Sequence, residues 1–283
     1  MRALRDYQAS VRETAAFALG NIHSEPATTI PALMTALGDK DANVRQNAAG
    51  ALSMDANCKG YTAKDLGSIA PSVVSALAFA LRDPSDAVRQ AAGRSLVTYG
   101  SDAGTSLPTF IDLLSDANAR SLAIEIIAAI GPDAQPAVAA LTAMLKDGNV
   151  DAQLDAAAAL AKIGANLPQA LPVAARVLSH DDADVRLRAA AVVGMFGPAA
   201  EPAIPRLSIA LDDNDVAVQR MAIASFRKIV AALVQARRTD AIDVLKAAAT
   251  AVARSRDHVV VALGPEIDDA IKSLEAMQAP WPR

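Results

Sequence analysis

Seven segments of this chain share one small apolar position that precedes an alanine-rich amphipathic stretch. The positions are Val11, Val44, Val88, Ala119, Ala152, Val185 and Val218. They are separated by 33, 44, 31, 33, 33 and 33 residues. A period of this size is typical of repeat proteins, in which one unit cannot bury its apolar face alone and stacks on its neighbours. The repeat therefore limits the possible folds more than any other feature of the sequence.

The stretch after each small apolar position has helical periodicity. Val88, Ala92, Leu96 and Tyr99 follow the spacing i, i+4, i+8 and i+11, which places side chains on one face of a helix. A helix C-terminus favours glycine because glycine tolerates a positive φ. Four repeats have a glycine there: Gly100, Gly131, Gly164 and Gly197.

A second periodic stretch precedes each of these helices, starting near a proline and ending in leucine. These stretches cover residues 26–37, 71–81, 108–114, 136–145, 168–178 and 202–211. Proline in the first turn of a helix costs no hydrogen-bond donor. Acidic turns such as residues 38–41 and 83–86 follow, and their carboxylates are suited to capping the next helix. Each repeat is therefore predicted to be a pair of antiparallel helices.

The run Asp-x-Asp-x-x-Val-Arg-x-x-Ala-Ala-x-x-Leu, followed by a Gly-Pro link as at Gly131 and Gly197, resembles HEAT repeats. It is most similar to the short bacterial type named after phycobilisome lyases. The resemblance covers residues 1–230 and implies an all-α fold: an α-solenoid of the HEAT/armadillo type, a right-handed superhelix of stacked antiparallel helix pairs. It also implies contacts between Asp and Arg of adjacent repeats, which should weaken where Gln153 and Gln219 replace the arginine.

We expect two regions along the chain. Residues 1–230 form an array of about seven units, with an inserted loop at 54–70 that lengthens one link by eleven residues. Residues 231–283 form capping helices, expected at 231–238, 239–256 and 265–277, and a tail. A helix pair that docks a partner is the alternative to a cap, and Trp281 is either a frayed tail or a docking anchor. The first unit lacks its first helix, which leaves open that the chain is a fragment of a larger multidomain protein.

Composition argues against several classes of function. Aromatic residues make up only 3% of the chain, so a wide aromatic-lined cavity for a large cofactor is not expected. A net charge of −4 does not favour nucleic acid or an anionic membrane. The sequence offers no apolar run of eighteen residues, hence no predicted membrane span. Cys58 is the only cysteine, which favours a soluble protein of a reducing compartment, the cytoplasm rather than the exterior.

Catalytic constellations are not found in the sequence. The histidines His23, His180 and His258 lie in separate links, and none has a partner at metal-ligand spacing. The phosphate-binding Gly-x-x-x-x-Gly-Lys loop and the Gly-x-Ser-x-Gly elbow are also missing. We therefore predict no catalytic residue, cofactor or metal, and the acidic turns are interpreted as helix caps.

The predicted concave surface, formed by the second helices, is the main candidate site. Its candidate partner-binding residues are Glu13, Phe17, Gln46, Gln90, Arg94, Leu154, Leu187, Arg220 and Arg227. Leu154 and Leu187 are expected to be exposed there, unless they pack between repeats. Exposed leucines flanked by polar residues suit a helix or peptide.

The predicted function is therefore a non-catalytic scaffold that binds a partner protein or peptide. The inserted loop, with Cys58, Lys59 and Tyr61, is a second candidate surface, or a tolerated insertion. The alternative function, implied by the resemblance, is a bilin lyase-like enzyme or an accessory subunit. The oligomeric state and the identity of the partner do not follow from the sequence.

Overall fold

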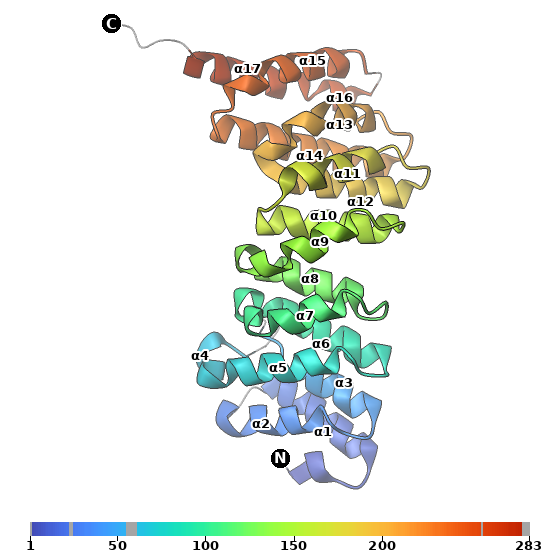
Figure 1. The fold of residues 1–283 in the computed structure, drawn as a ribbon, viewed down its shortest axis with the longest axis vertical. Helices are drawn as coiled ribbons and strands as arrows, with labels where there is room; N and C mark the ends of the chain where they lie inside the picture. Colours follow the sequence, from blue (N-terminus) through green and yellow to red (C-terminus); the bar gives the residue numbers. More distant parts are fainter. Residues whose placement is uncertain (1, 23–24, 55–60, 256, 279–283) are drawn as a thin grey trace, which may run out of the picture. The chain divides into compact units, whose positions relative to one another are not determined.

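The computed structural model describes residues 2–22, 25–54, 61–255 and 257–278. Within these ranges the chain is helical and contains no β-strand, which confirms the predicted all-α class. Contacts between Cα atoms divide the chain into two compact units, Met1–Ala140 and Leu141–Arg283. In each unit, successive helix pairs stack side by side (Figure 1).

Unit 1 begins with η1 (Arg2–Arg5) and α1 (Ala9–Ile22). Its helix pairs are α2 (Pro26–Ala36) with α3 (Ala42–Ala51), α5 (Ala70–Ala80) with α6 (Asp86–Thr98), and α7 (Leu107–Leu113) with α8 (Arg120–Ile130). Short elements connect them: α4 (Ala63–Leu66), η2 (Gly67–Ile69), η3 (Gly100–Ser106) and η4 (Gly131–Ala137). Within this unit the second helices α1, α3, α6 and α8 pack on one another in that order.

Helix α9 (Val138–Met144) runs across the boundary between the units. Unit 2 continues with α10 (Val150–Ile163), α11 (Leu167–Val177), α12 (Ala183–Val193), η5 (Gly194–Ala203), α13 (Ile204–Ala210) and α14 (Val216–Gln235). It ends with η6 (Thr239–Ala241), α15 (Ile242–Ala253), α16 (His258–Val261) and α17 (Gly264–Gln278).

Most of the predicted start and stop signals of the helices are confirmed. All four glycines expected at positive φ have it, with values of 54°, 72°, 76° and 54° at Gly100, Gly131, Gly164 and Gly197. Acidic residues cap three of the second helices: Asp41 at α3, Asp182 at α12 and Asp215 at α14 accept backbone N–H groups of the first turn. The turn at residues 83–86 does not cap α6 in this way, because the N-cap residue is Ser85 and makes no side-chain cap hydrogen bond. The helices expected from 136 and 202 begin as the 3-10 segments η4 and η5.

The C-terminal helices differ from the prediction. Helix α14 continues without a break from Val216 to Gln235, so the expected array end at residue 230 falls inside a helix. The following helices are α15 and α17, with the short α16 between them. The predicted helix start at 231 is wrong because no turn residue interrupts the chain there. How the array and the C-terminal helices divide into domains stays a prediction.

An arginine and an aspartate connect adjacent repeats at the turn between the two helices of a pair. Arg45 of α3 donates to both carboxylate oxygens of Asp83, with Nε–Oδ2 and Nη2–Oδ1 distances of 2.7 and 2.8 Å. Arg12 holds Asp39 and Arg186 holds Asp213 in the same bidentate way. These are the contacts that the resemblance implies.

The two repeats with glutamine have neutral donors in place of this arginine. Gln219 donates to the Asp257 carboxylate at 3.2 Å, in place of a bidentate charged pair. Gln153 donates to the Asp147 carbonyl and accepts from Arg176 at 2.8 Å. A hydrogen bond between a neutral amide and a carboxylate is weaker than an Arg–carboxylate pair. The contact that Gln219 makes is therefore the weaker form expected from the sequence.

One helical stretch in the described part of the chain, Arg120–Met144, is long and apolar enough to cross a membrane by length and composition, although none was expected. It combines α8, η4 and α9, and is interrupted at Gly131 and Pro136. Its most apolar window is 44% buried. The buried core helix of a soluble protein can have the same length and apolar composition.

Candidate partner-binding groove

A groove lies along the second helices α1, α3 and α6 of unit 1. Its volume is about 290 Å³, and its lining residues are Phe17, Gly20, Asn21, Gln46, Asn47, Gly50, Ala51, Ser53, Ala91 and Arg94. The structure therefore brings together Phe17, Gln46 and Arg94, three of the residues predicted from the repeat register. We call this cavity the α1–α3–α6 groove.

The repeat register places the residues of the groove. Phe17, Gly50 and Arg94 each lie six residues after the small apolar position of their repeat. That small position is buried at Val44 and Val88, which orients α3 and α6 so that the sixth position faces away from the helix pair. Phe17 is 61% exposed, which is unusual for a phenylalanine.

The polar side chains of the groove include three without an intramolecular partner. Within the described ranges, no hydrogen bond or ion pair involves the side chains of Gln46, Asn47 or Arg94. The Asn21 side chain, in contrast, donates to the Phe17 carbonyl at 2.9 Å. The groove thus presents two amides and a guanidinium to whatever enters it.

Two other predicted residues of unit 1 lie beside this cavity. Glu13 of α1 and Gln90 of α6 are half-buried and do not line the groove. They come two residues after the small apolar position. Gln46, at the same position of α3, does line the groove, so this position lies at the edge of the groove.

The prediction for Leu154 is wrong. Its side chain is fully buried, so it is not exposed on a concave surface. The half-buried Gln46, Gln90 and Leu187 show that this register position lies at the edge of a helix interface. A leucine there gains roughly 1.5–3 kcal/mol by complete burial. The alternative, that the leucines pack between repeats, holds for Leu154.

Leu187 is half-buried, and the residue that follows it takes part in a charged cluster. The adjacent Arg188 of α12 bridges two carboxylates of α10, Asp151 and Asp155. Burial raises the pKa of Asp155 above its usual value, although Arg188 opposes that shift. These ion pairs connect α12 to α10 next to Leu187 in the sequence.

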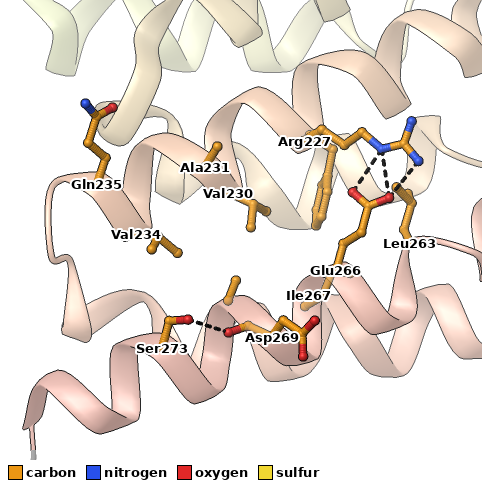
Figure 2. A pocket seen from close by; sticks show the side chains of 12 residues that line it. Arg227, Val230, Ala231, Val234, Gln235, Leu263, Glu266, Ile267, Asp269 and Ser273 are labelled. Carbon is orange, nitrogen blue, oxygen red and sulfur yellow. Dashed lines mark hydrogen bonds and ion pairs between the residues drawn. The ribbon is translucent and has the colours of Figure 1, made fainter.

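A second cavity of about 450 Å³ lies between α14 and α17 in unit 2. Val230 and Val234 of α14 point toward α17 in Figure 2, and Ile267 and Ala270 contribute from α17. Arg227 closes one end by an ion pair with Glu266, at 2.8 Å between Nη2 and Oε1. Of the predicted residues, Arg227 is thus paired and Arg220 is exposed. The sequence did not predict this cavity, because the predicted end of the array at residue 230 divides α14 into two segments.

Residues 55–60 of the inserted loop, which include Cys58 and Lys59, lie outside the described residues. Tyr61 is described and fully buried, so it cannot contact a partner from the surface as predicted. Burial raises the pKa of the Tyr61 hydroxyl to about 12. The Tyr61 backbone N–H donates to the Ser53 carbonyl. This hydrogen bond joins the two sides of residues 54–60 in the inserted loop.

The described residues contain no group of three or more His, Cys, Asp or Glu side chains arranged to hold a metal. His180 accepts the backbone N–H of Asp182 at Nδ1, and His258 lies exposed at the start of α16.

Comparison with protein-family models identifies the type of repeat in this array. The sequence model of HEAT repeats matches residues 1–96, 107–194 and 138–227, well over half of the chain. The chain belongs to the HEAT-repeat family. Its fold is that of an α-solenoid, as the resemblance implied. Among curated proteins, no sequence is similar enough to count as a match.

Several solved structures are similar to this chain at low sequence identity. The Kap95p–RanGDP nuclear import complex contains a chain that is 14% identical with a TM-score of 0.63, over 95% of this chain and 40% of that one. The YibA protein of Escherichia coli is 19% identical with a TM-score of 0.54, over 97% and 90%. The CpcE–CpcF complex of phycocyanin lyase from a Nostoc species is 21% identical with a TM-score of 0.49, over 96% and 92%.

Proposed function

We propose that this HEAT-repeat chain is a non-catalytic scaffold that binds a partner protein or peptide in the α1–α3–α6 groove. One observation carries the proposal. The exposed Phe17 lines the same cavity as Gln46, Asn47 and Arg94, whose side chains have no partner in the described part of the chain. Aromatic and arginine side chains dominate the energetics of many protein interfaces, so Phe17 and Arg94 are suitable anchors.

The scaffold role agrees with what arrays of this fold do. The Kap95p of the nuclear import complex binds a protein, RanGDP. Repeat stacking produces long surfaces in which each unit adds side chains at equivalent positions. A function in attaching bilins would require a reactive group in the groove, and the lining residues that the structure describes include no cysteine or histidine.

Two alanine variants with a matched control test this proposal. Phe17→Ala and Arg94→Ala should each remove the same proteins from an affinity capture with the full chain from its native source, identified by mass spectrometry. The control is Phe79→Ala, because Phe79 is 77% exposed on α5 and does not line the groove. Each single loss should weaken binding by at least about 1 kcal/mol, or roughly fivefold.

Unchanged capture by both groove variants would overturn the proposal. Equal losses with Phe17→Ala and Phe79→Ala would also overturn it, because exposed aromatic surface in general would then explain the capture. Circular dichroism should show that all three variants keep the wild-type helix content, since these side chains are exposed.

A further inference from the structure

The α1–α3–α6 groove has a notch at Gly50. Phe17, Gly50 and Arg94 occupy the same register position on three helices that pack side by side. Only the middle one lacks a side chain. A Cβ atom placed on Gly50 would meet no atom within 4 Å. The notch is therefore open space between an aromatic ring and a guanidinium.

Among the described residues that line the groove, Arg94 is the only charged one. It is exposed and makes no ion pair within the described ranges. Glu125 of α8 and Glu13 of α1 lie on neighbouring helices but do not line the cavity. A guanidinium binds a carboxylate with two parallel hydrogen bonds, a geometry that lysine cannot provide. The charge in the groove is therefore complementary to an acidic side chain.

The two amides define the conformation of what binds. Gln46 and Asn47 are consecutive residues of α3 whose side chains have no hydrogen-bond partner in the described part of the chain. Each primary amide offers donors and an acceptor, as a peptide unit does. In a helical partner, the backbone N–H and C=O groups are satisfied internally and cannot use these amides. An extended segment leaves its backbone groups free to pair with them.

We propose that the groove binds an extended acidic segment of the partner. A Glu or Asp side chain of that segment enters the notch above Gly50 and pairs with Arg94. The amides of Gln46 and Asn47 pair with its backbone, and an adjacent apolar side chain packs on Phe17. This inference rests on the proposed function and names the chemistry of the partner.

Synthetic peptides test the inference directly on the full chain. The probes are two fluorescein-labelled peptides, one of four Glu-Leu repeats and one of four Lys-Leu repeats, with binding measured by fluorescence anisotropy. Wild type should bind the Glu-Leu peptide at least tenfold more tightly. Arg94→Glu should reverse this preference, whereas Arg82→Glu should leave it unchanged; Arg82 is an exposed arginine just after α5 that does not line the groove, and its substitution changes the net charge by the same amount. An equal effect of the two substitutions would overturn the assignment to Arg94.

Two further measurements test the notch and the extended backbone. Gly50→Leu fills the notch and should weaken binding of the Glu-Leu peptide at least tenfold, while the helix content of the protein is retained. A Glu-Leu peptide with N-methylated backbone amides keeps its charge but loses its donors, and should also bind at least tenfold more weakly. Equal affinity of the methylated and unmethylated peptides would overturn the backbone contacts, and unchanged binding by Gly50→Leu would overturn the notch.

The two proposals fail in different ways. If capture of the native partner depends on Phe17 but the Glu-Leu peptide does not bind, the acidic segment is wrong and the scaffold function stands. If the peptide binds through Arg94 while capture is independent of Phe17 and Arg94, the scaffold function at this groove is wrong.

Discussion

At the scale of single residues, an arginine and an aspartate connect neighbouring repeats at three places, Arg12–Asp39, Arg45–Asp83 and Arg186–Asp213. Arg45 donates to Asp83 and also to the carbonyls of Asp39 and Lys40, which end the preceding turn. The Asp83 carboxylate in turn accepts the backbone N–H of Ser85. One ion pair thus satisfies backbone groups on both sides of the contact, which a pair of apolar residues cannot do.

These contacts predict a pH dependence of stability. The hydrogen bond from the arginine holds the pKa of Asp39, Asp83 and Asp213 below the usual 3.8. Since the folded-state pKa is lowered, the stabilisation is complete above the unfolded pKa of about 4 and is lost as the pH falls through the folded value. We expect denaturation midpoints to fall steeply below about pH 4.

Asp83→Asn isolates one of these pairs. It should lower the free energy of unfolding by about 2 kcal/mol at pH 7, because hydrogen bonds to a charged group are lost. The difference from wild type should shrink below pH 4, where wild-type Asp83 also becomes protonated. The measurement is urea denaturation followed by circular dichroism between pH 3 and 7. A difference independent of pH would contradict the assignment; Asp86→Asn, at an exposed pair with Arg89, is the control.

At the scale of helices, glycines decide how closely the second helices approach. A Cβ on Gly20 of α1 would lie 2.6 Å from the Ala51 Cβ and 2.9 Å from its Cα, so the two backbones touch at this point. Gly194 likewise leaves no room for a side chain against Ser225. Gly50 has open space instead, although it lies on the same kind of helix. Glycine therefore has two roles in the array: it lets two helices come into close contact, as at Gly20, or it leaves open space on the groove surface, as at Gly50.

Two alanine substitutions separate these roles. Gly20→Ala should destabilise the protein, because the backbone of α3 must move to admit the methyl group, and overpacking costs about 1–3 kcal/mol. Gly50→Ala should stabilise it by about 0.5–1 kcal/mol, because alanine favours the helix and meets no atom. Thermal denaturation of both variants measures the difference. Equal shifts of the two midpoints would contradict the packing described for Gly20.

At the scale of the whole molecule, stability comes from contacts between neighbouring repeats. In unit 1, α5 packs against α6 and α2, and α6 against α3 and α8, so each layer is held by the adjacent layers. Alanine supplies much of the buried surface, since Ala48, Ala92 and Ala123 are fully buried. Such an array loses stability locally rather than all at once.

Leu77→Ala tests this locality. Leu77 is a fully buried residue of α5, and its truncation should cost about 2–5 kcal/mol. Amide hydrogen exchange followed by mass spectrometry should become faster in α5, α6 and their neighbours, while α14 and α15 keep wild-type protection. A uniform increase along the chain would show instead that the molecule unfolds as one cooperative unit.

Sequence alone determined the all-α class, the repeat register and the ends of most helices. These properties depend on local chemistry: apolar spacing, proline at helix starts, and glycine at positive φ as in Gly164. The register also identified Phe17, Gln46 and Arg94 as neighbours in space, because equivalent positions of stacked repeats lie on one surface.

Tertiary structure alone decided which of those side chains are accessible. Leu154 and Phe17 were both predicted to be exposed on the concave surface, yet the leucine is buried and the phenylalanine is exposed. The notch at Gly50 and the cavity between α14 and α17 were likewise invisible in the sequence. The physical reason is that exposure depends on how far the neighbouring helix stands away. That separation is set by side chains of a different repeat, far along the chain.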